Sequence, residues 1–220
     1  MSGAPPTVAA LYVDPNGVYA GLPGVEVWDE KRDARRYAGP WPVVAHPPCA
    51  RWSRLAGFTE ARFGYKRGED GGCFAAALAS VRRFGGVIEH PADSRAFYNF
   101  GLPIPGRAGE WTGTLLDEGW SCYIEQGRYG FPVRKATWLY AVGTELPPLR
   151  WGRVNAYGEF TWMRKPGARP RVASPRNLGR IDGWRDEWAH GYKTATSITP
   201  PAFRDVLLAM ARSAAGAVDE

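Results

Sequence analysis

The eight residues Pro42-Val43-Val44-Ala45-His46-Pro47-Pro48-Cys49 decide the predicted fold of this chain. The apolar run Pro42 to Ala45 is short and rich in β-branched residues, which predicts a buried strand. The two prolines have no amide hydrogen to donate, so the strand stops there and the chain continues as a stiff extended turn. Cys49 then lies on a loop at the carboxyl end of a strand, where open α/β sheets bind their ligands.

A second run, Gly86-Val87-Ile88, ends in Glu89-His90-Pro91 and predicts a second strand. The residues between the two runs predict a helix, because Phe74, Leu78, Val81 and Phe84 recur at helical spacing. A strand-helix-strand crossover places Cys49 and Glu89 on the same edge of one sheet. The pair is a candidate nucleophile with an acid partner. The alternative is a buried structural cysteine followed by a loop.

The whole pattern predicts an α/β fold with a Rossmann-like, mostly parallel sheet and helices on both faces. We expect one main domain formed by residues 1–146 and 195–220, with an inserted loop region or small subdomain at 147–194. The basic segment 51–71 is expected to be a mobile loop. Further strands are expected at 8–14, 25–28, 121–125 and 137–142, short helices near 31–37 and 94–100, and a final helix from Thr199-Pro200, with Phe203, Leu207 and Met210 buried.

Composition favours an acidic partner and a reducing compartment. The net charge is +6 and the pI is about 9.4, which is typical of proteins that bind nucleic acid. Several of the ten tryptophans stand beside arginine, a pairing that can stack bases and neutralise phosphates or can simply cover a thin core. Cys49, Cys73 and Cys122 form no CxxC pair, and no signal peptide or long apolar run is present, so we expect free thiols and a cytoplasmic protein.

Taken in order, these pieces resemble the DNA cytosine-5 methyltransferases. Pro47-Pro48-Cys49 is similar to that family's Pro-Cys nucleophile motif, and Ile88-Glu89-His90-Pro91 is similar to its Glu-Asn-Val motif at the family's usual distance from the cysteine. The stretch Tyr129 to Thr137 resembles the Gly-Val-Pro-Gln-Arg-Arg segment, and Ser197-Ile198-Thr199-Pro200 resembles the late Leu-Thr-Pro stretch. The His-Pro-Pro-Cys, Glu-His-Pro and Lys-Ala-Thr elements also resemble uncharacterised prophage proteins, which implies the host cytoplasm as the location.

The resemblance implies that DNA is the partner and that a flipped cytosine, or another pyrimidine, is modified. A thiolate of Cys49 adds to C6 of the ring while Glu89 hydrogen-bonds N3, and His46 or Arg51 is expected to supply the positive field that favours the thiolate. The residues expected to line the base pocket are His46, Pro48, Trp52 and His90. The residues expected to contact DNA are Arg51, Arg62, Lys66, Arg67, Arg128, Arg134 and Lys135.

The resemblance also implies S-adenosylmethionine as the methyl donor. The expected cofactor residues are Asp14, Gly17 and Asp29, at the ends of the first two strands. The family's glycine-rich loop is reduced here to Gly17, and only 20 residues separate Asp29 from Cys49, which shortens the adenine pocket.

Three other functions fit parts of the pattern. One is a non-catalytic nucleic-acid-binding protein on a degenerate methyltransferase scaffold, such as a phage protein that masks DNA from host restriction. Another is a metal-dependent hydrolase or deaminase using His46, Cys49 and His90, but the His-x-Glu and Pro-Cys-x-x-Cys motifs of zinc deaminases are absent, so no metal is expected. The third is an exocyclic-amine methyltransferase, which Cys49 in place of an aromatic residue disfavours.

Overall fold

The computed structural model describes residues 7–53, 56–64, 66–131, 135–152 and 199–215. The expected α/β fold is confirmed. Within these ranges, no helix has the length and apolar character needed to cross a membrane. The helices are η1 Ala34–Arg36, α1 Ala56–Phe63, α2 Cys73–Phe84, α3 Arg95–Asn99, η2 Gln126–Tyr129 and α6 Pro201–Ala215.

Seven strands form one sheet in the order β2-β1-β3-β4-β7-β6-β5. The four strands β2, β1, β3 and β4 are parallel, and β7, β6 and β5 continue the sheet through antiparallel pairings. The strand bounds are β1 Val8–Leu11, β2 Val25–Trp28, β3 Val43–Ala45, β4 Gly86–Pro91, β5 Trp111–Thr114, β6 Asp117–Glu125 and β7 Ala136–Val142.

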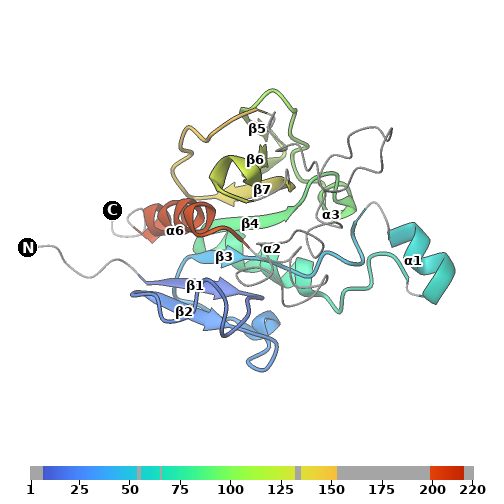
Figure 1. Ribbon diagram of the computed structural model, residues 1–220, viewed down its shortest axis with the longest axis horizontal. Coiled ribbons are helices and arrows are strands. Elements are labelled where there is room, and N and C mark those ends of the chain that lie inside the picture. The colour runs from blue at the N-terminus through green and yellow to red at the C-terminus, as the bar shows by residue number, and fades with distance from the viewer. Residues whose placement is uncertain (1–6, 54–55, 65, 132–134, 153–198, 216–220) are drawn as a thin grey trace, which may run out of the picture.

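The helices α2 and α6 cover opposite faces of this sheet (Figure 1). Phe74, Leu78 and Val81 of α2 pack on one face, as their helical spacing predicts. The opposite face is covered by α6 through Phe203, Leu207 and Met210, again as predicted. Successive residues of a strand point to opposite faces, so every strand residue can be assigned to the α2 side or the α6 side.

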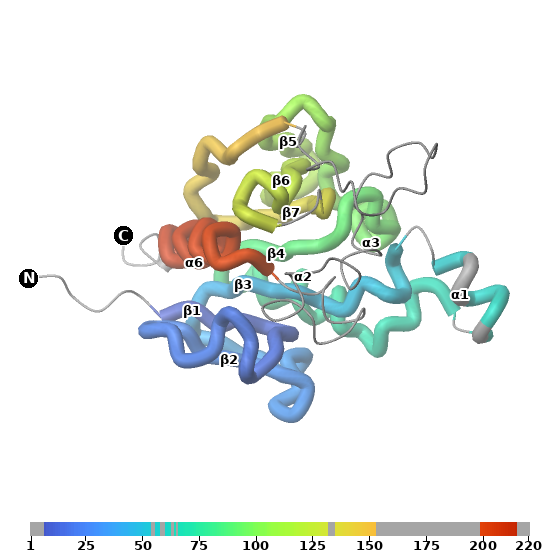
Figure 2. The backbone as a smooth tube through the Cα atoms, viewed as in Figure 1, coloured from blue at the N-terminus to red at the C-terminus, as the bar shows by residue number. Residues whose placement is uncertain are grey.

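Several element boundaries differ from those expected from the sequence. The expected loop at 51–71 contains α1, which lies beyond the carboxyl end of β3 (Figure 2). The first strand ends at Leu11 because Tyr12 takes a φ of 60° and turns the chain. Leu149, inside the expected insertion, packs in the core beneath α6, whereas residues 153–194 of that insertion lie outside the described ranges.

Gly86 begins β4, the strand that carries Glu89, at a point where no side chain fits. A Cβ at this position would lie 2.0 Å from the carbonyl oxygen of Val43, and the φ of 126° is rare for other residues. We expect Gly86→Ala to lower the free energy of unfolding by about 3 kcal/mol or more, because a backbone strand must move. Gly21→Ala is the control. Its φ is also positive but its Cβ would meet nothing within 4 Å, so only the backbone strain of roughly 1–2 kcal/mol is expected. Urea denaturation measures both, and equal losses would contradict this account.

Candidate active site

The carboxylate of Glu89 and the imidazole of His46 meet on the α6 side of the sheet. Val87 and Val44 lie in the core beneath α6. Glu89 follows Val87 by two residues along β4. His46 follows Val44 by two residues and lies just past the end of β3, where its amide still donates to the carbonyl of Leu11 at 3.0 Å. The alternation of side chains therefore places both residues on the same side. Nδ1 of His46 and Oε2 of Glu89 are 3.0 Å apart. The two strand ends therefore place the expected acid beside the first residue of the His-Pro-Pro-Cys motif.

The second carboxylate oxygen of Glu89 is held by Gln126, the first residue of η2. The side-chain amide of Gln126 donates to Oε1 of Glu89 at 2.9 Å and lies 3.0 Å from the hydroxyl oxygen of Thr137. That hydroxyl in turn donates to the main-chain oxygen of Lys135 at 3.1 Å. Gln126 and Thr137 are fully buried. Residues next to the antiparallel strands thus bind the second oxygen of a carboxylate that lies on a parallel strand.

Glu89 is ionised despite its burial. Burial alone would raise the pKa of Glu89, but the ammonium of Lys135 and the hydrogen bond and charge of His46 outweigh it and hold the pKa at about 2. Burial lowers the pKa of Lys135, and the negative charges of Glu89 and Cys49 oppose that decrease. The backbone of Lys135 has a φ of 32°, which a lysine rarely adopts. The chain therefore accepts backbone strain at the residue that neutralises Glu89.

The ionised carboxylate places a hydrogen on one ring nitrogen of His46. A carboxylate can only accept, so Nδ1 of His46 carries the hydrogen. The hydroxyl of Tyr19 lies 2.8 Å from Nε2 on the other side of the ring. Burial and the charge of Glu89 hold the pKa of Tyr19 well above its ordinary value, so this hydroxyl keeps its proton beside Nε2. The chain Tyr19–His46–Glu89 holds the carboxylate in one orientation.

The thiol of Cys49 interacts electrostatically with Glu89 and Lys135. Cys49 is partly exposed. Burial and the negative charge of Glu89 raise its pKa, while Lys135 lowers it. The thiol is therefore protonated in the free protein at neutral pH. The cation that favours its thiolate is Lys135, where the sequence led us to expect His46 or Arg51.

This arrangement predicts that two substitutions shift the pKa of the Cys49 thiol in opposite directions. Glu89→Gln removes a negative charge and should lower that pKa, whereas Lys135→Met removes a positive charge and should raise it. The pH dependence of iodoacetamide alkylation, measured for the Cys49 peptide by mass spectrometry, gives the pKa. Glu118→Gln, an exposed carboxylate of β6, is the control and should change nothing. Two shifts of the same sign would contradict the placement of these charges.

Only one of the four residues expected to line a base pocket joins Glu89. His90 points to the α2 side, where it is fully buried against Phe74 at 5.2 Å between ring centroids, and burial lowers its pKa to about 4. Trp52 is also buried and donates its indole hydrogen to Asp70 at 2.8 Å. Pro48 is exposed next to Cys49. His46 is the member of this set that contacts the acid.

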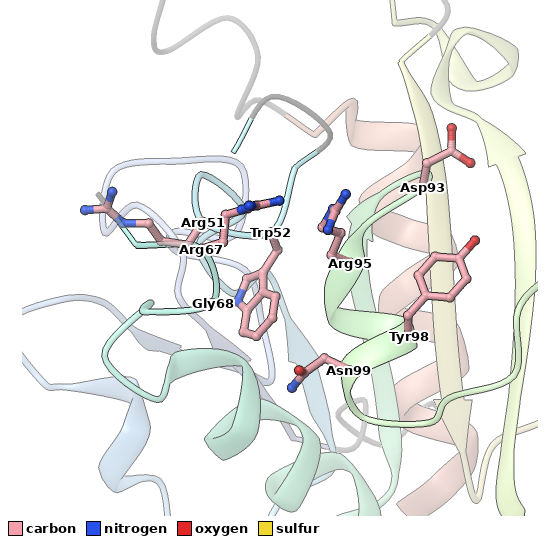
Figure 3. A pocket seen from close by; sticks show the side chains of 8 residues that line it. All are labelled: Arg51, Trp52, Arg67, Gly68, Asp93, Arg95, Tyr98 and Asn99. Carbon is pink, nitrogen blue, oxygen red and sulfur yellow. The ribbon is translucent and has the colours of Figure 1, made fainter. Parts of the chain in front are cut away.

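The cations expected to contact DNA lie in several different places. Arg51 and Arg67 line a pocket of about 1010 Å³ beside the Cys49 turn (Figure 3). Lys135 is partly exposed, and its charge acts on Glu89 and Cys49 in the candidate site. Of the others, Arg62 lies on α1, Lys66 forms an ion pair with Glu69, Arg128 lies in η2, and Arg134 falls outside the described residues.

The residues expected to bind S-adenosylmethionine do lie at the carboxyl edge of the sheet, but they do not form a cradle. The carboxylate of Asp14 accepts from the amide of Asn16 at 2.8 Å, and a Cβ added to Gly17 would meet Asp14 itself at 3.1 Å. Asp29 accepts from the amide of Arg32 at 2.9 Å. These groups are engaged in their own turns, so the described residues do not fit the donor and we derive no step through it.

Sequence reasoning missed Tyr19, Gln126 and Thr137. Gln126 and Thr137 are polar residues at the end of one expected strand and at the start of the next, and this position is the sequence signal that could have identified them. The signal is useful only when the strand order is known, because β7 lies beside β4 only in the folded sheet. Nothing in the local sequence marks Tyr19.

Comparisons with known proteins give no further information. No family model, no curated protein and no solved structure matches this chain. Among the described residues, no three histidine, cysteine or carboxylate side chains are grouped so that they could hold a metal ion. The geometry of the site must therefore carry the functional argument.

Proposed function

We propose that this chain is a DNA-modifying transferase that activates a flipped pyrimidine, most simply cytosine, through covalent addition of Cys49. One observation carries the proposal. Cys49, the ionised Glu89 and the cation of Lys135 act on one another at the ends of adjacent strands. A protein that only binds DNA has no chemical need for a thiol and an oriented, buried carboxylate in one place. The family resemblance and the cytoplasmic location are part of this proposal.

The chemistry follows from the positions of the charges. The Sγ atom of Cys49 bonds to C6 of the ring, the ring electrons move toward N3, and the proton lost by the thiol is balanced by the proton gained at N3. The anion of Glu89 accepts a hydrogen bond from that N3–H, and Lys135 stabilises the thiolate before the attack. The product carries a carbon–carbon double bond between C4 and C5, so C5 becomes nucleophilic and can take up a transferred group. Loss of the C5 proton and of the thiol restores the aromatic ring.

Covalent trapping tests base activation separately from the donor. DNA in which pyrimidin-2-one replaces cytosine has an electron-poor C6 and accepts a thiolate without any donor. DNA containing 5-fluorocytosine is trapped only after a group has been transferred to C5, since fluorine cannot leave as a proton. Pools of random sequence, both single- and double-stranded, allow for an unknown target. We expect a denaturation-resistant complex with the first pool. A complex with the second pool only when S-adenosylmethionine is added would identify that donor.

The alternative is a DNA-binding protein on a degenerate scaffold, and the raised pKa of the Cys49 thiol favours it. It predicts salt-dependent binding to both pools without a covalent complex in either. The trapping experiment therefore separates the two functions.

A further inference from the structure

A pocket lies close to Cys49, and its wall includes Arg51 and Trp52, two and three residues further along the chain. We name it the arginine pocket after Arg51, Arg67 and Arg95, and its wall also contains Trp52, Asp93 and Tyr98 (Figure 3). Its volume of about 1010 Å³ is at the upper end of the range for small-molecule sites, so it has room for a nucleotide.

Main-chain hydrogen bonds join the walls of the arginine pocket to the Cys49 turn. The amide of Trp52 donates to the carbonyl of Cys49 at 3.0 Å, and the amide of Arg95 donates to the carbonyl of Trp52 at 2.9 Å. The amide of Gly68 donates to the carbonyl of Arg51 at 3.1 Å. Three separate segments of the chain are thus fixed against one another, with the nucleophile at the end of the same turn.

The charge of the pocket suits an anion. It contains three guanidinium groups and one carboxylate, Asp93, which pairs with Arg107 outside the pocket at 3.3 Å. Arg67 pairs with Glu60 on α1. In the described part of the chain, the guanidinium group of Arg95 has neither an ion pair nor a hydrogen bond of its own. A planar guanidinium with free donors matches the oxygens of a phosphate.

The aromatic groups suit the rest of a nucleotide. The indole of Trp52 is held rigid by Asp70 and by the ring of Phe100, 5.9 Å away between centroids. Tyr98 of α3 is 60% exposed and lines the pocket, where a sugar or a base can pack against its ring. An acidic peptide offers carboxylates but no flat ring for this surface.

We infer that the arginine pocket binds the phosphate of the nucleotide whose base, or whose neighbour's base, reaches Cys49. This inference rests on the proposed function, because it assigns the phosphate-binding part of the same substrate. The phosphate belongs either to a DNA strand or to a free nucleotide, and the arms of the experiment distinguish these sources.

Calorimetric titration of the full chain tests the inference with three probes: deoxycytidine, deoxycytidine monophosphate and a short single-stranded DNA of random sequence. Arg95→Gln is the test variant. Arg83→Gln is the matched control, because Arg83 is an exposed arginine in the last turn of α2 and does not line the pocket. We expect Arg95→Gln to weaken phosphate-containing probes roughly 10- to 100-fold at low salt. It should also reduce the slope of log affinity against log salt for the DNA by about 0.7.

The probes that bind identify the source of the phosphate. Binding of the monophosphate but not of deoxycytidine indicates a free nucleotide, and binding of the DNA alone indicates a strand. No binding of any probe, or equal behaviour of Arg95→Gln and Arg83→Gln, overturns the inference. If Arg95→Gln weakens DNA binding but the unmodified chain forms no covalent complex, the phosphate site stands and the proposed function is contradicted. If Arg95→Gln forms the covalent complex with pyrimidin-2-one DNA at the same rate and with the same yield as the unmodified chain, the proposed function stands and the phosphate site is contradicted.

Discussion

Cys49→Ser should abolish the covalent complex with pyrimidin-2-one DNA, reducing its rate of formation by at least about 10³-fold. A serine hydroxyl ionises far less readily than a thiol and is a weaker nucleophile, and Lys135 alone cannot compensate for that difference. The change removes little volume from a partly exposed side chain, so the fold should be preserved. Denaturing gel electrophoresis of the reaction over time gives the rate.

The other two cysteines provide the controls for this experiment. Cys73 begins α2 and Cys122 is buried in β6, and neither interacts with Glu89 through any contact described above. Cys73→Ser should leave the rate of complex formation unchanged. A complex that survives Cys49→Ser and disappears in Cys73→Ser would remove Cys49 from the mechanism.

Glu89→Gln should slow formation of the complex by roughly 10²- to 10³-fold while leaving noncovalent DNA binding nearly intact. The amide has no charge to stabilise the developing N3–H group, which is where the transition state gains most from the carboxylate. The neutral side chain also lowers the thiol pKa, which favours attack, so the measured loss will understate the contribution of the carboxylate. Rates should be compared at a pH where the Cys49 thiol is ionised to the same extent in both proteins.

Glu125→Gln is the matched control, since Glu125 is also a buried carboxylate but points to the α2 side and accepts from the hydroxyl of Tyr123 at 2.6 Å. Its substitution should affect stability and not the rate. Equal losses in the two variants would mean that Glu89 acts through the fold rather than on the substrate.

The parallel half of the fold could be predicted because its elements carry local signals. The Pro-Pro after β3 ends a strand, and Gly85-Gly86 marks the change from α2 to β4, both through backbone chemistry. The apolar residues Phe74, Leu78 and Val81 mark α2 through their helical spacing. The antiparallel half was harder to predict. The order of β7, β6 and β5 depends on long-range pairing, and β5 with its Gly113 gives a weak strand signal.

Part of the candidate site could also be predicted from local signals in the sequence. Cys49 and Glu89 follow adjacent parallel strands, so the topology alone brings them to one edge. The electrostatic role of Lys135 toward Glu89 could not be predicted from the sequence. A lysine near a turn suggests a phosphate contact, and only the strand order brings Lys135 close to Glu89. His90 was misleading, because it neighbours Glu89 in sequence, yet the alternation of strand residues sends it to the opposite face.

Peptide mapping of the complex with pyrimidin-2-one DNA tests the central claim most directly. After nuclease and protease digestion, mass spectrometry identifies the residue that carries the nucleotide remnant. We predict a single modified peptide, with the remnant on Cys49. Attachment to Cys73 or Cys122, or the absence of any modified peptide from random-sequence pools of both single- and double-stranded DNA, would contradict covalent base activation by this chain.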